Sequence, residues 1–168
     1  RESAISFYEN WRTRYVLRRK YLYERSGYMD WALRGRLPDS VNVAKTRHGG
    51  AIFARSSSVV IRGGSVIAGG QAWKGFGGGI AGLASVILVE ASTLKSNSAL
   101  SGGGVHTLEC EISMVQTMAV GNIASNDGAG MHLGKDSYAE IIEATFRSNY
   151  AETGFGGSIF GSSLVHLF

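Results

Sequence analysis

The sequence contains very little cysteine or proline: a single cysteine, Cys110, and a single proline, Pro38, in 168 residues. One cysteine cannot form an intramolecular disulfide, so the chain is not a small domain held together by disulfide bonds. One proline, without a Gly-X-Y period, excludes a collagen-like chain even though 24 residues are glycine. No run of 18 apolar residues is present, so no transmembrane helix is expected.

Positive charge is almost confined to the first part of the chain. Residues 1–48 contain eleven Lys and Arg against five Asp and Glu, whereas residues 49–168 contain six against eight. Of the 24 glycines, 22 lie from Gly49 onward. We therefore divide the sequence into a basic arm, residues 1–48, and a glycine-rich part, residues 49–168. Because the chain starts at Arg1, we expect a fragment or a product of upstream processing.

The arm has apolar residues at the spacing of one helix face. They are Phe7, Trp11, Tyr15 and Leu22. This pattern predicts an α-helix that starts at Ser3 or Ser6 and stops near Gly27. A second, short helical turn is expected from Met29 to Leu33, before Pro38.

Three roles are open for this basic, aromatic arm. It can cap the first coil of a repeat structure, whose exposed edge must be covered. It can dock onto a larger protein assembly, since Arg and aromatic residues dominate interface hot spots. It can also contact an anionic membrane surface, with nucleic acid as the least favoured partner. The candidate partner-binding residues are Trp11, Arg12, Arg14, Tyr15, Arg18 and Arg19.

A glycine-rich tetrapeptide recurs through the rest of the chain. Its copies start at Gly49, Gly77, Gly102, Gly128 and Gly156, and each ends in an apolar residue. These apolar residues, Ile52, Ile80, Val105, Met131 and Ile159, are 28, 25, 26 and 28 residues apart. A period in the twenties is typical of a solenoid, in which each coil buries its apolar face against the next coil.

Aligning the copies places further residues in common rows. Two rows are Val59, Ile87 and Ile112, and Ile61, Val89 and Met114, which Ala139 and Ile141 continue after one extra residue. The next row is Val66, Leu94 and Phe146, with Met118 one residue early, and the last is Asn97, Asn122 and Asn149, with Gly69 in the first coil. The two-residue steps indicate strands with one buried face. We predict an all-β fold: a short right-handed parallel β-helix of four to five coils with an N-terminal α-helical arm, the handedness following from the rule for parallel crossovers.

Two of these motifs resemble a known family. Gly49-Gly50-Ala51-Ile52 and Phe146-Arg147-Ser148-Asn149 are similar to the paired GGA[ILV] and FxxN repeats of chlamydial-type polymorphic outer-membrane proteins, within the pectin-lyase-like β-helix group. The resemblance covers about residues 49–160. It implies a parallel β-helix, and it implies an adhesin-type role.

The sequence shows no catalytic constellation. The acidic residues of the coils do not share a register, and pectin-lyase-like enzymes use clustered aspartates. One pair stands out: His106 and His132 each follow an aligned apolar residue, so we expect stacked neighbours that face solvent. Two imidazoles could share a metal, but two ligands rarely suffice. We therefore expect no catalytic residue, no cofactor and no metal.

These observations favour a non-catalytic interaction subunit. In this hypothesis the coils form a scaffold, and the basic arm joins it to other protein subunits of a larger assembly, with a membrane-associated assembly as one option. The alternatives are a secreted or cell-surface adhesin-type domain and a fragment of a carbohydrate-active β-helix enzyme.

Overall fold

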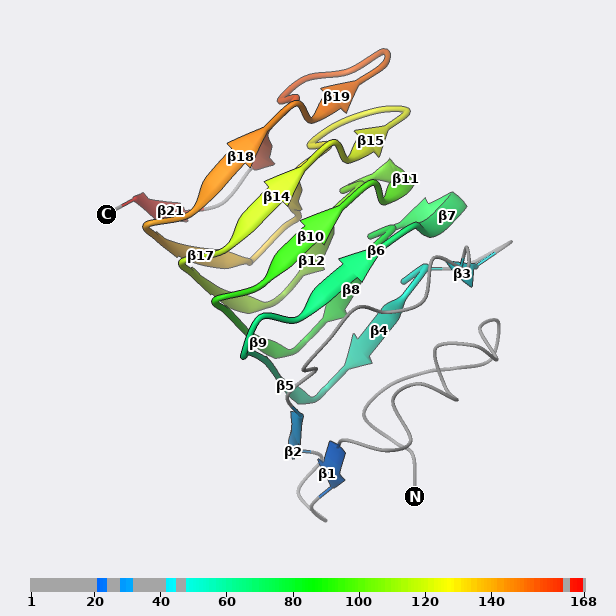
Figure 1. Ribbon diagram of the computed structural model, residues 1–168. Helices are drawn as coiled ribbons and strands as arrows, with labels where there is room; N and C mark the ends of the chain where they lie inside the picture. The colour runs from blue at the N-terminus through cyan, green and yellow to red at the C-terminus, as the bar shows by residue number, and fades with distance from the viewer. Residues whose placement is uncertain (1–20, 24–27, 32–41, 45–47, 162–163, 168) are drawn as a thin grey trace.

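The protein is a parallel β-solenoid of about four coils. The computed structural model describes residues 21–23, 28–31, 42–44, 48–161 and 164–167. Figure 1 shows the coils stacked side by side along one axis, from β4 at one end to β18 and β19 at the other. Within these residues no helix is present, and therefore none that is long and apolar enough to cross a membrane.

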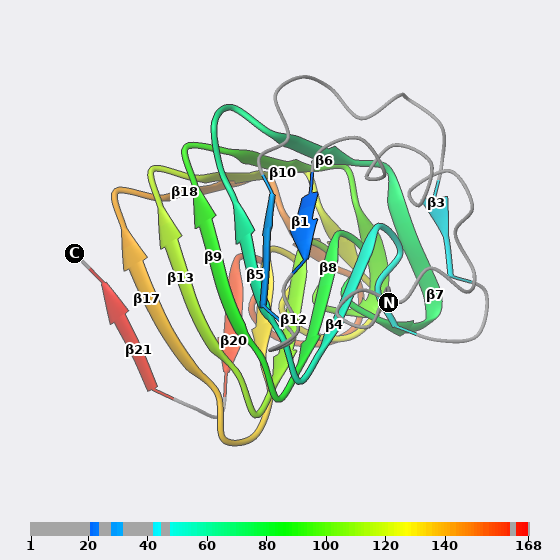
Figure 2. The same ribbon diagram turned by 90° about the horizontal axis from the view of Figure 1, so that it is seen from below.

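Each coil contributes one strand to each of four sheets, which we number in the order in which a coil passes through them. Sheet 1 contains β4 (Ile52–Arg55), β8 (Ile80–Leu83), β12 (Val105–Leu108), β16 (Met131–Leu133) and β20 (Ile159–Gly161). Sheet 2 contains β1 (Tyr21–Tyr23), β2 (Tyr28–Trp31), β5 (Ser58–Ile61), β9 (Val86–Glu90), β13 (Glu111–Val115), β17 (Tyr138–Ile142) and β21 (Leu164–Leu167). In Figure 2 the strands of sheet 2 lie side by side, with β21 at the C-terminal edge.

Sheets 3 and 4 complete each coil. Sheet 3 contains β6 (Val66–Ala68), β10 (Thr93–Lys95), β14 (Met118–Val120) and β18 (Thr145–Arg147). Sheet 4 contains β3 (Asn42–Val43), β7 (Gly70–Phe76), β11 (Ser98–Ser101), β15 (Ile123–Ala124) and β19 (Tyr150–Ala151). All described strand pairs are parallel except β1 with β2.

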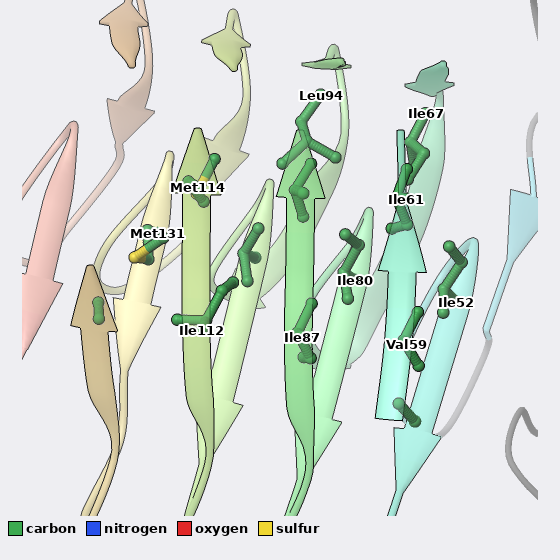
Figure 3. Close-up of a cluster of buried hydrophobic side chains, with 14 of the residues drawn as sticks. Ile52, Val59, Ile61, Ile67, Ile80, Ile87, Leu94, Ile112, Met114 and Met131 are labelled. Carbon is green, nitrogen blue, oxygen red and sulfur yellow. The ribbon is translucent and has the colours of Figure 1, made fainter. Parts of the chain in front are cut away.

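The core is a set of apolar rows that run along the solenoid axis (Figure 3). Ile52, Ile80, Val105 and Met131 pair in sequence across sheet 1, and none is more than 1% exposed. Val59, Ile87, Ile112 and Ala139 form the matching row of sheet 2, and they are buried as deeply. Both predicted rows are confirmed, because alternate side chains of each strand point inward and parallel pairing puts equivalent positions above one another.

The third predicted row is wrong by one residue in two coils. The buried row of sheet 3 contains Ile67, Leu94, Ala119 and Phe146. Val66 and Met118 are displaced by one position, and Met118 is 47% exposed. A shift of one residue reverses which face of a strand a side chain occupies. Counting residues between apolar positions cannot detect this shift when two adjacent residues are both apolar.

The predicted row of Asn97, Asn122 and Asn149 is confirmed, and their side chains form a ladder of hydrogen bonds. Asn97 and Asn122 are fully buried, and the Asn97 side-chain Nδ2 donates to Oδ1 of Asn122 at 3.0 Å. Asn122 Nδ2 donates in turn to Oδ1 of Asn149, also at 3.0 Å. In the first coil the residue opposite Asn97 is Gly70, not Gly69, and its backbone N–H donates to Asn97 Oδ1 at 2.9 Å. The ladder satisfies amides that burial would otherwise leave without partners.

A second polar row lines the corner between sheets 1 and 2. The backbone N–H of Ser57 donates to Ser85 Oγ, that of Ser85 to Cys110 Sγ, and that of Cys110 to Ser137 Oγ. The Cys110 thiol also donates to the carbonyl of Leu108 at 3.2 Å. Burial raises the pKa of this thiol. Cys110 therefore occupies the position that a serine takes in the other coils.

The predicted helices are wrong for the part of the arm that the structure describes. Leu22 lies in strand β1, and Met29 lies in β2, which pairs in parallel with β5 through Met29 and Val59. The edge of the first coil offers unpaired backbone groups, and pairing with them outweighs a weak local preference for helix. Strand β3 likewise joins β7. The six candidate partner-binding residues, Trp11 to Arg19, lie outside the described residues.

Candidate functional site

The histidine pair of the coils is the chemical feature that sequence analysis singled out. β12 and β16 place His106 directly beside His132, with ring centroids 4.7 Å apart and an interplanar angle of 3°. The predicted stacking is therefore confirmed. The predicted exposure is wrong for His106, which is only 9% exposed, while His132 is half-buried.

Phe76 is the reason why His106 is buried. Its ring stacks on His106 with centroids 4.6 Å apart. On the side of β12 away from His132, the residue of sheet 1 that pairs with His106 is Ala81, which is too small to cover an imidazole. Phe76 comes from sheet 4, where the register shifts between Ala99 and Ser101 so that Phe76 pairs with Ser101.

The sequence carried a signal for this arrangement. The spacing from Ile52 to Ile80 is 28 residues, whereas that from Ile80 to Val105 is 25. One of the three extra residues lies in the corner between β5 and β6. The other two lie within β7 and carry Phe76 over the small side chain of Ala81.

The two histidines belong to a row of rings that runs along the outside of the solenoid. His48 stacks on Phe76 at 5.0 Å, and His132 contacts Phe160 at 5.3 Å in a tilted geometry. Stacked ring pairs of this kind add stability beyond the area that they bury. The full row is Phe53, His48, Phe76, His106, His132, Phe160 and Phe155.

Both imidazoles are held in the neutral form. The pKa of His106 is lowered to about 3, first by burial and then by the neighbouring imidazoles of His132 and His48. Burial also lowers the pKa of His132, although the carboxylate of Asp127 acts in the opposite direction. A neutral ring can stack without the cost of burying a charge.

The geometry does not suit a shared metal ion. Two parallel ring planes project their nitrogen lone pairs side by side, whereas metal ligands must converge on one point. The coils and the other described residues contain no group of three His, Cys, Asp or Glu side chains that could hold a metal ion. Within the same residues, His132 Nδ1 and Thr107 Oγ1 are buried and have no hydrogen-bond partner. His106 and His132 pack against each other and against Phe76 and Phe160 in the ring row.

The comparisons with known proteins add no family assignment. No protein-family model, no curated protein and no solved structure matches this chain.

Proposed function

We propose that the protein is a non-catalytic structural and interaction subunit, built on a right-handed parallel β-helix. The observation that carries this proposal is the pairing of β2 with β5 and of β3 with β7. These strands belong to residues 1–48, so they join the basic part of the chain to the first coil. Residues 1–20, which contain six Lys and Arg, lead directly into β1.

The proposed partner surface is acidic and partly apolar. Arginine binds carboxylates through two parallel hydrogen bonds, and Trp and Tyr supply large contact areas at interface centres. We assign these roles to Arg12, Arg14, Arg18 and Arg19, and to Trp11 and Tyr15. Other protein subunits of a larger assembly are the favoured partners. The alternative is peripheral contact with an anionic membrane surface, which is negatively charged like the proposed partner surface.

Point substitutions test this proposal better than deletion of the arm does, because deletion would also remove β2 and β3. A variant with Arg12, Arg14, Arg18 and Arg19 changed to Ser should lose co-purifying partner proteins in a quantitative pull-down. Its thermal unfolding should change little. The matched control changes the exposed arginines of the coils, Arg55 and Arg147, to Ser.

The proposal fails if the arm variant and the control retain partners equally. A variant with Trp11 and Tyr15 changed to Ser distinguishes the capping role. If that variant alone melts at a lower temperature and aggregates, the arm covers the first coil and does not dock.

An adhesin-type surface domain is the second candidate. The supporting observation is that Phe146 and Asn149 occupy the apolar row of sheet 3 and the asparagine ladder, respectively, as a structural repeat motif would. This supports a kinship in architecture with the polymorphic outer-membrane repeats. Binding of the intact protein to host-cell surfaces, unaffected by the arm substitutions, would favour this candidate.

A further inference from the structure

Exposed apolar side chains of the coils gather on one side of the solenoid, formed by sheets 3 and 4. Trp73 in β7, Met118 in β14 and Ile123 in β15 are 65%, 47% and 42% exposed. They point outward, because an alanine next to each of them in the strand is fully buried. Each of these strands pairs with a described strand on both sides, so an end of the solenoid is not the reason for the exposure. Exposed apolar side chains that gather in this way mark an interaction surface.

Charge is divided between the sheets. In the described strands of sheets 3 and 4, the charged residues are all cationic: Lys74, Lys95 and Arg147. In β9, β13 and β17 of sheet 2, the charged residues are all acidic: Glu90, Glu111 and Glu140. Within the described part of the chain, none of these six side chains forms an ion pair. We call the outward side of sheets 3 and 4 the basic face, and the outward side of β9, β13 and β17 the acidic face.

The charges of the two faces have the same spacing along the solenoid axis. Lys95 in β10 and Arg147 in β18 occupy one row two coils apart, because both align with Val120 of the coil between them. Glu90 in β9 and Glu140 in β17 are also two coils apart, since β13 lies between their strands. Neighbouring strands of a sheet are about 4.8 Å apart, so both separations along the axis are about 10 Å.

We propose that the basic face of one copy binds the acidic face of a second copy, so that the protein associates side by side. β9 leads into β10, and β17 leads into β18, so each of these two glutamates lies in the same coil as one of the cations. Two solenoids with parallel axes and level coils therefore bring Lys95 of one copy to the height of Glu90 of the other, and Arg147 to the height of Glu140. Complementary charges at matched spacing favour this partner over others and set how the two copies align.

Apolar side chains accompany the charges on both faces. The basic face contributes Met118 and Ile123, and the acidic face contributes Val86, which is 51% exposed, and the half-buried Leu88. The two faces are unlike, so a bound copy keeps a face of its own that can bind a further copy. Figure 2 agrees with such a row of copies, since the strands of sheet 2 lie on one side of the solenoid and β7 of sheet 4 lies on the other. Exposed ion pairs contribute little each, so the association should be weak and sensitive to salt.

Sedimentation equilibrium of the full chain tests this association. The weight-average mass should rise with protein concentration to at least about twice the monomer mass, and high salt should weaken the association by about tenfold. A variant with Lys95→Glu and Arg147→Glu should stay monomeric, and so should a variant with Glu90→Lys and Glu140→Lys. An equimolar mixture of the two variants should associate again, because each supplies the charge that the other needs. This rescue also shows that both variants are folded.

The matched control is Arg55→Glu with Lys135→Glu, which changes the net charge by the same amount outside both faces. This control should associate like the parent protein, and an equal loss of association would overturn the proposal, because net charge alone would then explain the result. A parent protein or a mixture that stays monomeric overturns it as well. Binding to vesicles of anionic phospholipid by a protein that stays monomeric would make the basic face a lipid-binding surface instead.

The arm variant described above separates this inference from the proposed function. With Arg12, Arg14, Arg18 and Arg19 changed to Ser, the protein should still associate with itself, whether or not it loses its partner proteins. Loss of self-association in this variant would mean that the arm, and not the basic face, binds the acidic face of a second copy.

Discussion

Asn122 is the residue on which the amide ladder depends most. Its Oδ1 accepts from both the backbone N–H and the Nδ2 of Asn97, and its own Nδ2 reaches Asn149. The change Asn122→Leu removes these partners while keeping a side chain of similar size. We expect a loss of about 1–3 kcal/mol of unfolding free energy, measured by urea denaturation, because Asn97 is left buried with an unsatisfied amide.

The control for this prediction is Asn126→Leu in the same coil. Asn126 is exposed, so its replacement should change stability by less than about 0.5 kcal/mol. Equal effects of the two substitutions would show that these asparagines act only as turn formers.

His106 makes the stability of the solenoid depend on pH. Its pKa falls from 6.5 in the unfolded chain to about 3 in the folded protein, so the unfolded state binds the proton more tightly. The contribution of neutral His106 to the free energy of unfolding is therefore fully present above pH 6.5 and is lost as the pH falls toward 3. Between pH 7 and pH 5 we expect a loss of about 2 kcal/mol from this group, measured by denaturant titration at both pH values.

The matched variant is His106→Phe, which keeps a ring between Phe76 and His132 but cannot titrate. The drop between pH 7 and pH 5 should be smaller by the amount assigned to His106. A variant with the same pH profile as the parent protein would contradict the proposed neutral stack.

At the scale of the element, strands such as β9 and β13 have one face in the core and one that is more exposed. Ile87 in β9 lies between Val59 and Ile112 and is 1% exposed, while its neighbour Val86 is 51% exposed. Ile87→Asp should cost several kcal/mol and abolish cooperative melting, because it buries an unpaired charge. Val86→Asp, one residue away, should have little effect. Similar melting curves for the two variants would contradict the observed register.

The corners between strands also show what tertiary contacts contribute. Nine described residues other than glycine have positive φ, among them Ala84, Ser96 and Glu109. This conformation is unfavourable for residues with a Cβ atom. The positive φ is stabilised because the strands on either side of each corner pair with adjacent coils. The corner residues also form such bonds: the Ala84 N–H donates to the Leu108 carbonyl, and the Ser96 N–H donates to the Val120 carbonyl. Glycine at every corner is therefore not required, contrary to a simple turn rule.

At the scale of the whole molecule, the strands of the described coils pair only with strands of the preceding and following coils, so stability should be graded along the axis. Core residues are covered on both sides in the middle coils, whereas Phe146 and Ile159 in the last described turn are only partly buried. We expect amides of β9 and β13 to exchange most slowly and those of β18 and β19 most rapidly, as measured by hydrogen exchange with mass spectrometry. Uniform exchange along the axis would instead indicate a single all-or-none opening.

The sequence by itself determined the coil architecture. Strict recurrence of residues such as Ile80, Val105 and Asn122 specifies stacked coils, because parallel in-register pairing is the arrangement that puts identical positions in contact. The same recurrence placed His106 beside His132. It also predicted that Asn97, Asn122 and Asn149 are neighbours, with a one-residue error at Gly69. In the third apolar row it was wrong by one residue at Val66 and Met118.

Only the tertiary structure decided what happens where the repeat is broken. The segment with Leu22 and Met29 has a helix-like pattern, yet it forms strands, because the open edge of the first coil provides backbone partners that no local pattern records. The burial of His106 depends on Phe76, which belongs to another sheet and is placed by two extra residues in β7. The spacing of the repeats in the sequence predicts contacts between equivalent residues of successive coils, such as His106 and His132. Contacts between non-equivalent residues, such as Phe76 and His106, arise only when the coils are stacked.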